Sequence, residues 1–148
     1  MIVHNEREAL CVAVEMERRA IRIYERALML VSDEAVRGGI GDILSQEKEH
    51  LKHFTAMREG YPTGEKEEQA LLQAMGAEAL FPGGVMEMER NRGLTTLQGL
   101  YAYAAESERH AMETYLSFAE KCRDEKVAGA FRAIAAEESA HLSQLRTK

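Results

Sequence analysis

Apolar residues recur along the chain at alternating steps of three and four in four long segments. This spacing gathers the apolar side chains onto one stripe of an α-helix. The pattern predicts helices near residues 6–31, 34–59, 95–122 and 125–146. Residues that commonly cap helix N-termini stand at or close to the expected starts: Asn5, Asp33, Thr95 and Asp124. The chain is therefore predicted to be all-α.

The connections between the predicted helices indicate how they are arranged. Only a few residues separate the first helix from the second and the third from the fourth, so each pair is expected to form an antiparallel hairpin. Residues 60–93 form a long crossover with breakers at Pro62 and Pro82 and a possible short helix at 66–75. The prediction is a single domain, residues 1–148, built as a four-helix bundle of two hairpins joined by the crossover.

An internal repeat supports two matching hairpins. A shift of 91 residues aligns the segment 13–51 with 104–142 without a gap, and fourteen of the 39 positions are identical. This similarity exceeds what a shared composition produces, so the hairpins are interpreted as copies of one unit. The bundle is expected to have a pseudo-twofold axis.

Acidic residues interrupt the apolar stripe of every predicted helix, and a histidine follows in two of them. The inward-facing residues are Glu17, Glu47, His50, Glu108, Glu138 and His141. Four buried carboxylates cannot all stay ionised without a compensating positive charge. Two divalent cations would balance the four negative charges, and each imidazole would add a neutral nitrogen ligand. We predict a site for two metal ions.

The spacing within each hairpin strengthens this prediction. The pairs Glu47 with His50 and Glu138 with His141 are three residues apart, which places them on one helix face where they can share a metal. In both hairpins the single glutamate precedes the Glu-x-x-His pair by 30 residues. The combination is far more specific than an isolated Glu-x-x-His pair.

Several nearby polar residues have expected roles outside the ligand set. Tyr24 and Tyr115 follow the single glutamates by seven residues on the buried stripe, where each hydroxyl is expected to donate to a ligand carboxylate. Glu49 and Glu137 are assigned to solvated faces, although Gln46 and Glu137, each four residues before a ligand histidine, are also candidates for supporting these histidines. Helical phase places other acids and histidines on solvated faces: Glu15, Glu106, His4, His53 and His110.

Composition excludes several classes of function. The net charge is −6 and no Lys/Arg cluster occurs, which argues against nucleic-acid binding. Apolar runs such as 27–31 are far shorter than the ~20 residues of a membrane span, and no signal peptide is recognisable. The two cysteines are too few for a disulfide framework, so a cytoplasmic setting is expected.

The chain resembles the rubrerythrin branch of the ferritin-like superfamily through Glu17, Tyr24, the segment 46–50, Glu108, Tyr115 and the segment 138–141. The resemblance implies two iron ions per chain and an oxidoreductase that acts on hydrogen peroxide or oxygen. No four-cysteine rubredoxin domain follows the bundle, so electrons are expected from an external donor such as a rubredoxin-type protein. A homodimer or higher homo-oligomer is also expected.

One departure keeps alternatives open. Rubrerythrins carry an extra glutamate about one turn after the third-helix ligand, where this chain has Ala111. The six-residue set is more similar to the symmetric centre of bacterioferritins, so iron oxidation and storage is the alternative function. Manganese or zinc uses similar ligands. A metal-free helical interaction module is a third class, but no basic residue lies on the predicted core stripes to pair with the acids.

Overall fold

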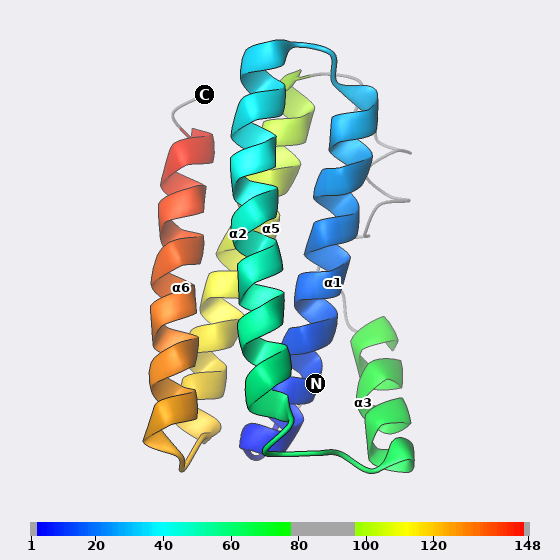
Figure 1. Ribbon diagram of the computed structural model, residues 1–148, viewed down its shortest axis with the longest axis vertical. Coiled ribbons are helices and arrows are strands. Elements are labelled where there is room, and N and C mark those ends of the chain that lie inside the picture. Colours follow the sequence, from blue (N-terminus) through cyan, green and yellow to red (C-terminus); the bar gives the residue numbers. More distant parts are fainter. Residues whose placement is uncertain (1–2, 78–96, 147–148) are drawn as a thin grey trace.

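The computed structural model describes residues 3–77 and 97–146, in which every secondary-structure element is a helix. The helices are α1 (Glu6–Leu30), α2 (Glu34–Arg58), α3 (Glu65–Ala77), α5 (Leu97–Lys121) and α6 (Glu125–Arg146). Four of them lie side by side as a bundle, and α3 packs against α1 (Figure 1). The all-α prediction is confirmed for this part of the chain. None of these helices is long and apolar enough to cross a membrane.

The predicted helix limits agree with the structure to within two residues wherever both ends are described. The possible short helix at 66–75 is present as α3, slightly longer than predicted. Thr95, the expected cap of the third long helix, lies outside the described residues, as does the part of the predicted crossover at 78–93. The complete course of the crossover therefore stays a prediction.

Side-chain caps explain where three helices begin. The carboxamide oxygen of Asn5 and a carboxylate oxygen of Asp33 each accept a hydrogen bond at 3.0 Å from the backbone N–H three residues later. A carboxylate oxygen of Asp124 accepts from the N–H two residues later at 2.9 Å. These contacts satisfy backbone donors that have no partner within the helix. The sequence signals for these starts are confirmed.

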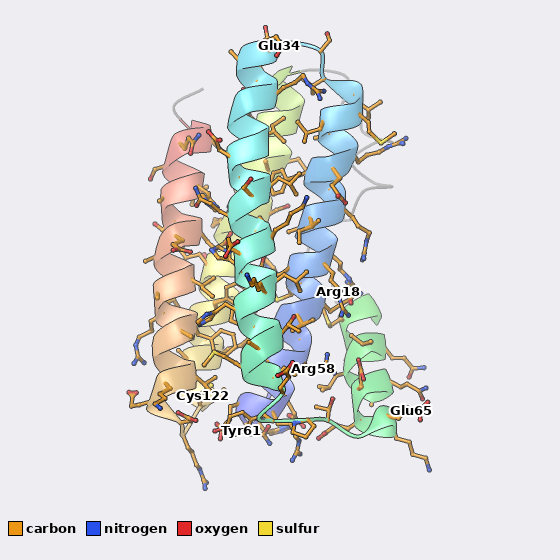
Figure 2. The ribbon with its side chains drawn as sticks, in the orientation of Figure 1. Arg18, Glu34, Arg58, Tyr61, Glu65 and Cys122 are labelled. Atoms are coloured by element: carbon orange, nitrogen blue, oxygen red, sulfur yellow. The ribbon has the colours of Figure 1, made fainter. Side chains whose placement is uncertain are left out.

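Helices that are consecutive in the sequence form the most extensive pairings, α1 with α2 and α5 with α6. The two pairs are tied together at one end of the bundle. There the Tyr61 hydroxyl, just beyond α2, donates to the carboxylate of Asp124 in the short connection before α6. Tyr61 and Cys122 mark this end in Figure 2. The contact holds the end of α2 near the turn of the other helix pair.

The core differs on the two sides of the buried glutamates and histidines. Towards the connection between α5 and α6 it contains four mutually packed aromatic rings, whose centroids are 5.1–6.4 Å apart: Phe54, Tyr115, Phe118 and Phe131. Towards the connection between α1 and α2, Tyr24 repeats Tyr115, but the other three corresponding positions hold buried aliphatic side chains: Leu145, Ala27 and Ile40. The hydrophobic packing therefore does not follow the repeat.

We predict that Phe131→Ala lowers the free energy of unfolding by about 3–5 kcal/mol, because a fully buried ring is replaced by a cavity. Urea unfolding of the metal-free protein, followed by circular dichroism, measures the change. Leu116→Ala on α5 is the control, since Leu116 is 45% exposed and its truncation removes little buried surface. Equal effects of the two substitutions would contradict a core centred on the aromatic rings.

Candidate metal centre

All six predicted ligand residues lie at one level inside the bundle, and all four long helices contribute. α1 and α5 each supply one glutamate, and α2 and α6 each supply a Glu-x-x-His pair. Each side chain is at most 3% exposed: Glu17, Glu47, His50, Glu108, Glu138 and His141. Each acid or imidazole replaces an apolar residue in an otherwise apolar stripe, so helix packing alone carries these groups into the core.

Their inward-facing atoms form two overlapping groups. In each group three carboxylate oxygens and one imidazole nitrogen lie within 4.8 Å of one another. The first group is Glu17, Glu47, His50 and Glu138, and the second is Glu47, Glu108, Glu138 and His141. Glu47 and Glu138 belong to both, so they lie between the two groups. Buried clusters of this kind are able to hold metal ions.

The Nδ1 atoms of both histidines point towards the carboxylates. His50 Nδ1 is 2.9 Å from Glu138 Oε1 and 3.6 Å from an oxygen of Glu17. His141 Nδ1 is 3.4 Å from an oxygen of Glu47 and 3.4 Å from an oxygen of Glu108. The centroids of the two imidazole rings are 6.1 Å apart. Each ring therefore faces a different half of the cluster.

The second nitrogen of each imidazole ring, Nε2, contacts a residue outside the cluster. His50 Nε2 contacts the Glu137 carboxylate, and His141 Nε2 contacts the Gln46 side-chain oxygen. Both partners accept hydrogen bonds, so each Nε2 carries a proton, and Nδ1 is the nitrogen that would bind a metal once it has lost its own proton. The predicted supporting role of Gln46 and Glu137 agrees with these contacts, although each supports the histidine of the other helix pair.

The tyrosines also reach across the bundle. The Tyr24 hydroxyl donates to Glu108 Oε1 at 2.5 Å, and the Tyr115 hydroxyl donates to Glu17 Oε1 at 2.8 Å. Burial raises the pKa of both tyrosines well above the ordinary value, and the neighbouring carboxylates add to this shift. The phenols therefore stay protonated and hold one oxygen of each carboxylate, which leaves the other oxygen to face inward.

Seven buried polar atoms of the cluster have no hydrogen-bond partner outside the cluster in the described part of the chain. They are Glu17 Oε2, Glu47 Oε1, His50 Nδ1, Glu108 Oε2, both carboxylate oxygens of Glu138, and His141 Nδ1. Buried polar atoms are nearly always hydrogen-bonded, and every one of these atoms is a potential metal ligand. The donor set therefore fits two cations held between the four helices.

The electrostatics of the metal-free cluster also show that the buried carboxylates need a compensating positive charge. Burial raises the pKa of Glu47 and Glu138 well above the ordinary value, and the charges of neighbouring carboxylates raise it further. Burial acts in the same direction on Glu108, but hydrogen bonds with Glu138 and His141 outweigh it and lower its pKa. No Lys or Arg is buried among the described residues. Protons thus compensate the repulsion in the absence of metal.

The residues placed on solvated faces lie outside the cluster. Glu15 is surrounded by arginines of α1, and Glu106 pairs with Arg109. His4 and His53 are exposed as predicted. His110 is an exception, because it is only partly exposed and its Nε2 is buried without a hydrogen-bond partner in the described residues. Its helical phase alone gave no sign of this burial.

Sequence reasoning missed one feature, a small cavity between α1 and α5 beside the carboxylates. Its volume is about 10 Å³, and its lining includes all four glutamates of the cluster together with Met16 and Ser107. The only sequence signal was a difference within the repeat, since Ser107 takes the position that corresponds to Met16. The cavity lies on the α1–α5 side of the cluster, whereas the histidines come from α2 and α6.

Comparisons with protein-family models, curated proteins and solved structures found no match for this chain. The function of this chain is therefore inferred from the cluster itself.

We predict that the metal-free protein loses stability as the pH rises from about 4.5 to about 9. Burial lowers the pKa of His141, but hydrogen bonds to Glu108 and Glu47 outweigh it and raise the pKa to about 9. Glu47 and Glu138 also hold protons more tightly than the unfolded chain does. Because the folded state binds these protons more tightly than the unfolded chain, protonation stabilises it, and this stabilisation is lost as the groups deprotonate. Urea unfolding across this range, with a chelator present, measures the trend.

Glu47→Gln should make this pH dependence weaker, because a buried carboxyl group that must stay protonated is replaced by a neutral side chain of similar shape. Glu49→Gln is the matched control, since Glu49 lies on the exposed face of the same helix. A metal-free protein whose stability is constant or rises across this pH range would contradict the electrostatic account of the cluster.

Proposed function

We propose that this chain is a rubrerythrin-like di-iron oxidoreductase, which reduces hydrogen peroxide or oxygen with electrons from an external donor. The observation that supports this proposal is the pair of overlapping buried groups that share Glu47 and Glu138, whose inward-facing ligand atoms have no partner outside the cluster in residues 3–77 and 97–146. Four glutamates with two Glu-x-x-His histidines form the ligand set of ferritin-like di-iron carboxylate proteins.

Charge and ligand type favour two divalent first-row ions. Four carboxylates carry four negative charges, which two such ions balance while the imidazoles stay neutral. Oxygen and imidazole ligands suit iron, manganese and zinc, and the resemblance to rubrerythrins favours iron. When bound, two ferrous ions supply one electron each, so that hydrogen peroxide takes up two electrons and two protons and leaves as two water molecules.

The surrounding residues are proposed to keep the ligands in place throughout this cycle. Tyr24 and Tyr115 restrain one oxygen of the single glutamates, whereas neither oxygen of Glu138 has a hydrogen-bond partner outside the cluster among the described residues. Glu138 is therefore free to change how it binds as the charge of the centre changes. Burial of the cluster beneath apolar side chains excludes bulk water from these carboxylates.

A ferritin-like topology fits this function. We infer that the two helix pairs are repeated antiparallel hairpins joined by a long crossover, as the internal repeat predicts. The pairing of α1 with α2 and of α5 with α6 supports this arrangement, as does the matched contribution of each pair to the cluster. Assembly into a homodimer or larger oligomer, reduction by a rubredoxin-type protein and a cytoplasmic location are further parts of the proposal.

The decisive experiment is an anaerobic titration of metal-free protein with ferrous iron. We expect two ions per chain, followed by rapid oxidation on addition of hydrogen peroxide or oxygen. Glu47→Ala should reduce the number of tightly bound ions, because this carboxylate belongs to both groups. Glu49→Ala, which removes an exposed carboxylate of the same helix, should bind two ions. Absence of specific iron binding by the wild-type protein would contradict the proposal.

The same protein also tests the alternative functions, iron storage and the binding of manganese or zinc. An iron-storage protein would form a large cage and accumulate many ferric ions per chain, whereas an oxidoreductase retains two and is reduced again by its donor. Size-exclusion chromatography with light scattering, together with iron analysis after aeration, separates these outcomes. Metal analysis of protein purified without added iron identifies a manganese or zinc relative.

We predict that Tyr24→Phe weakens ferrous iron binding about tenfold, because Glu108 loses the hydrogen bond that orients it. Tyr61→Phe is the matched control, since Tyr61 contacts Asp124 at the end of the bundle and touches no candidate ligand. Competition with a colorimetric chelator measures both affinities. Equal iron affinities in the two variants would show that the Tyr24 hydroxyl does not position Glu108.

A further inference from the structure

Ser107 is a buried hydroxyl beside the candidate metal centre whose hydrogen-bonding capacity is unused. It is 5% exposed, it lines the cavity between α1 and α5, and its Oγ has no hydrogen-bond partner among the described residues. Serines inside helices commonly bond back to a carbonyl of the preceding turn, and Ser107 does not. Leaving such a group unpaired carries a cost in stability, which calls for an explanation.

We propose that Ser107 donates a hydrogen bond to a small ligand with an acceptor atom, of the peroxide or azide type, that enters this cavity. The inference rests on the proposed function, because it concerns the substrate of the same centre. It assigns a binding role to a residue outside the six candidate ligands and the two tyrosines.

The size of the cavity limits the ligand. Its volume of about 10 Å³ is close to the roughly 10–15 Å³ that one water molecule requires by the same measure. A diatomic or triatomic ligand can place one terminal atom there, whereas an organic peroxide would have to displace side chains. The cavity thus favours hydrogen peroxide over bulkier peroxides.

The polarity of the lining requires a donor, and Ser107 is the group able to supply it. All four glutamates of the cluster line the cavity, and their carboxylates offer only acceptors once metal binding has ionised them. The hydroxyls of Tyr24 and Tyr115 already donate to these carboxylates. Among the lining hydroxyls, Ser107 alone has a proton that is not engaged in the described structure. A ligand with an acceptor atom would find its hydrogen bond there.

The internal repeat has no second hydroxyl at the position equivalent to Ser107. The position that corresponds to Ser107 on α1 is Met16, which is fully buried and lines the same cavity. A thioether has no proton to donate and is only a weak acceptor. A ligand in the cavity should therefore be oriented towards the half of the centre that contains Glu108, although the candidate ligands are arranged symmetrically.

The test measures azide binding to the cobalt(II)-loaded protein, in which azide is a stable analogue of the substrate and no turnover occurs. Wild-type protein should bind two cobalt ions and then azide, with a change in the visible absorption spectrum. Ser107→Ala should bind the same amount of cobalt and raise the azide Kd about tenfold, as expected for a lost hydrogen bond to an anion. Ser117→Ala, on the exposed face of α5, should leave the Kd unchanged.

Met16→Leu is the second control, because it changes the equivalent side chain without removing a donor, and it should alter the azide Kd by less than about twofold. A crystal structure of the azide complex should place a terminal nitrogen within hydrogen-bonding distance of Ser107 Oγ. An unchanged Kd in Ser107→Ala, lost cobalt binding in that variant, or azide bound elsewhere would overturn the inference. Wild-type protein that binds two cobalt ions but no azide would also overturn it. Absence of cobalt binding would instead count against the proposed function.

Discussion

The mutual repulsion of four buried carboxylates is the constraint on which the rest of this structure depends. An ionised carboxylate in a protein interior is strongly destabilising unless a positive charge or hydrogen bonds compensate it. In the metal-free chain, raised pKa values at Glu47 and Glu138 show that protons provide part of this compensation. Metal ions would replace these protons, so metal affinity, protonation and the stability of the bundle are thermodynamically linked.

The hydrogen bonds around the cluster connect the two helix pairs rather than closing within each pair. Tyr24 on α1 donates to Glu108 on α5, and Tyr115 on α5 donates to Glu17 on α1. The Nε2 atoms of the two histidines likewise contact residues of the other helix pair, between α2 and α6. Correct ligand geometry therefore requires the two halves to be docked, so the site is a property of the complete bundle.

The surroundings of the cluster depart from the symmetry of the candidate ligands. The outer partner of one histidine is a carboxylate and that of the other is an amide, which gives the two rings different basicity. Aromatic rings pack on one side of the cluster, and aliphatic side chains dominate the other. Ser107 faces the α1–α5 cavity where the repeat would place a methionine.

The sequence by itself determined the helices, their limits and the identity of the clustered residues. Helical periodicity is local, and a glutamate on an apolar stripe must be buried once that stripe is packed. Only the tertiary structure decided which groups meet across the bundle: Gln46 with His141, Glu137 with His50, and each tyrosine with the opposite glutamate. It also placed the α1–α5 cavity and buried one nitrogen of His110. These features depend on the rotation and separation of packed helices, which no local pattern specifies.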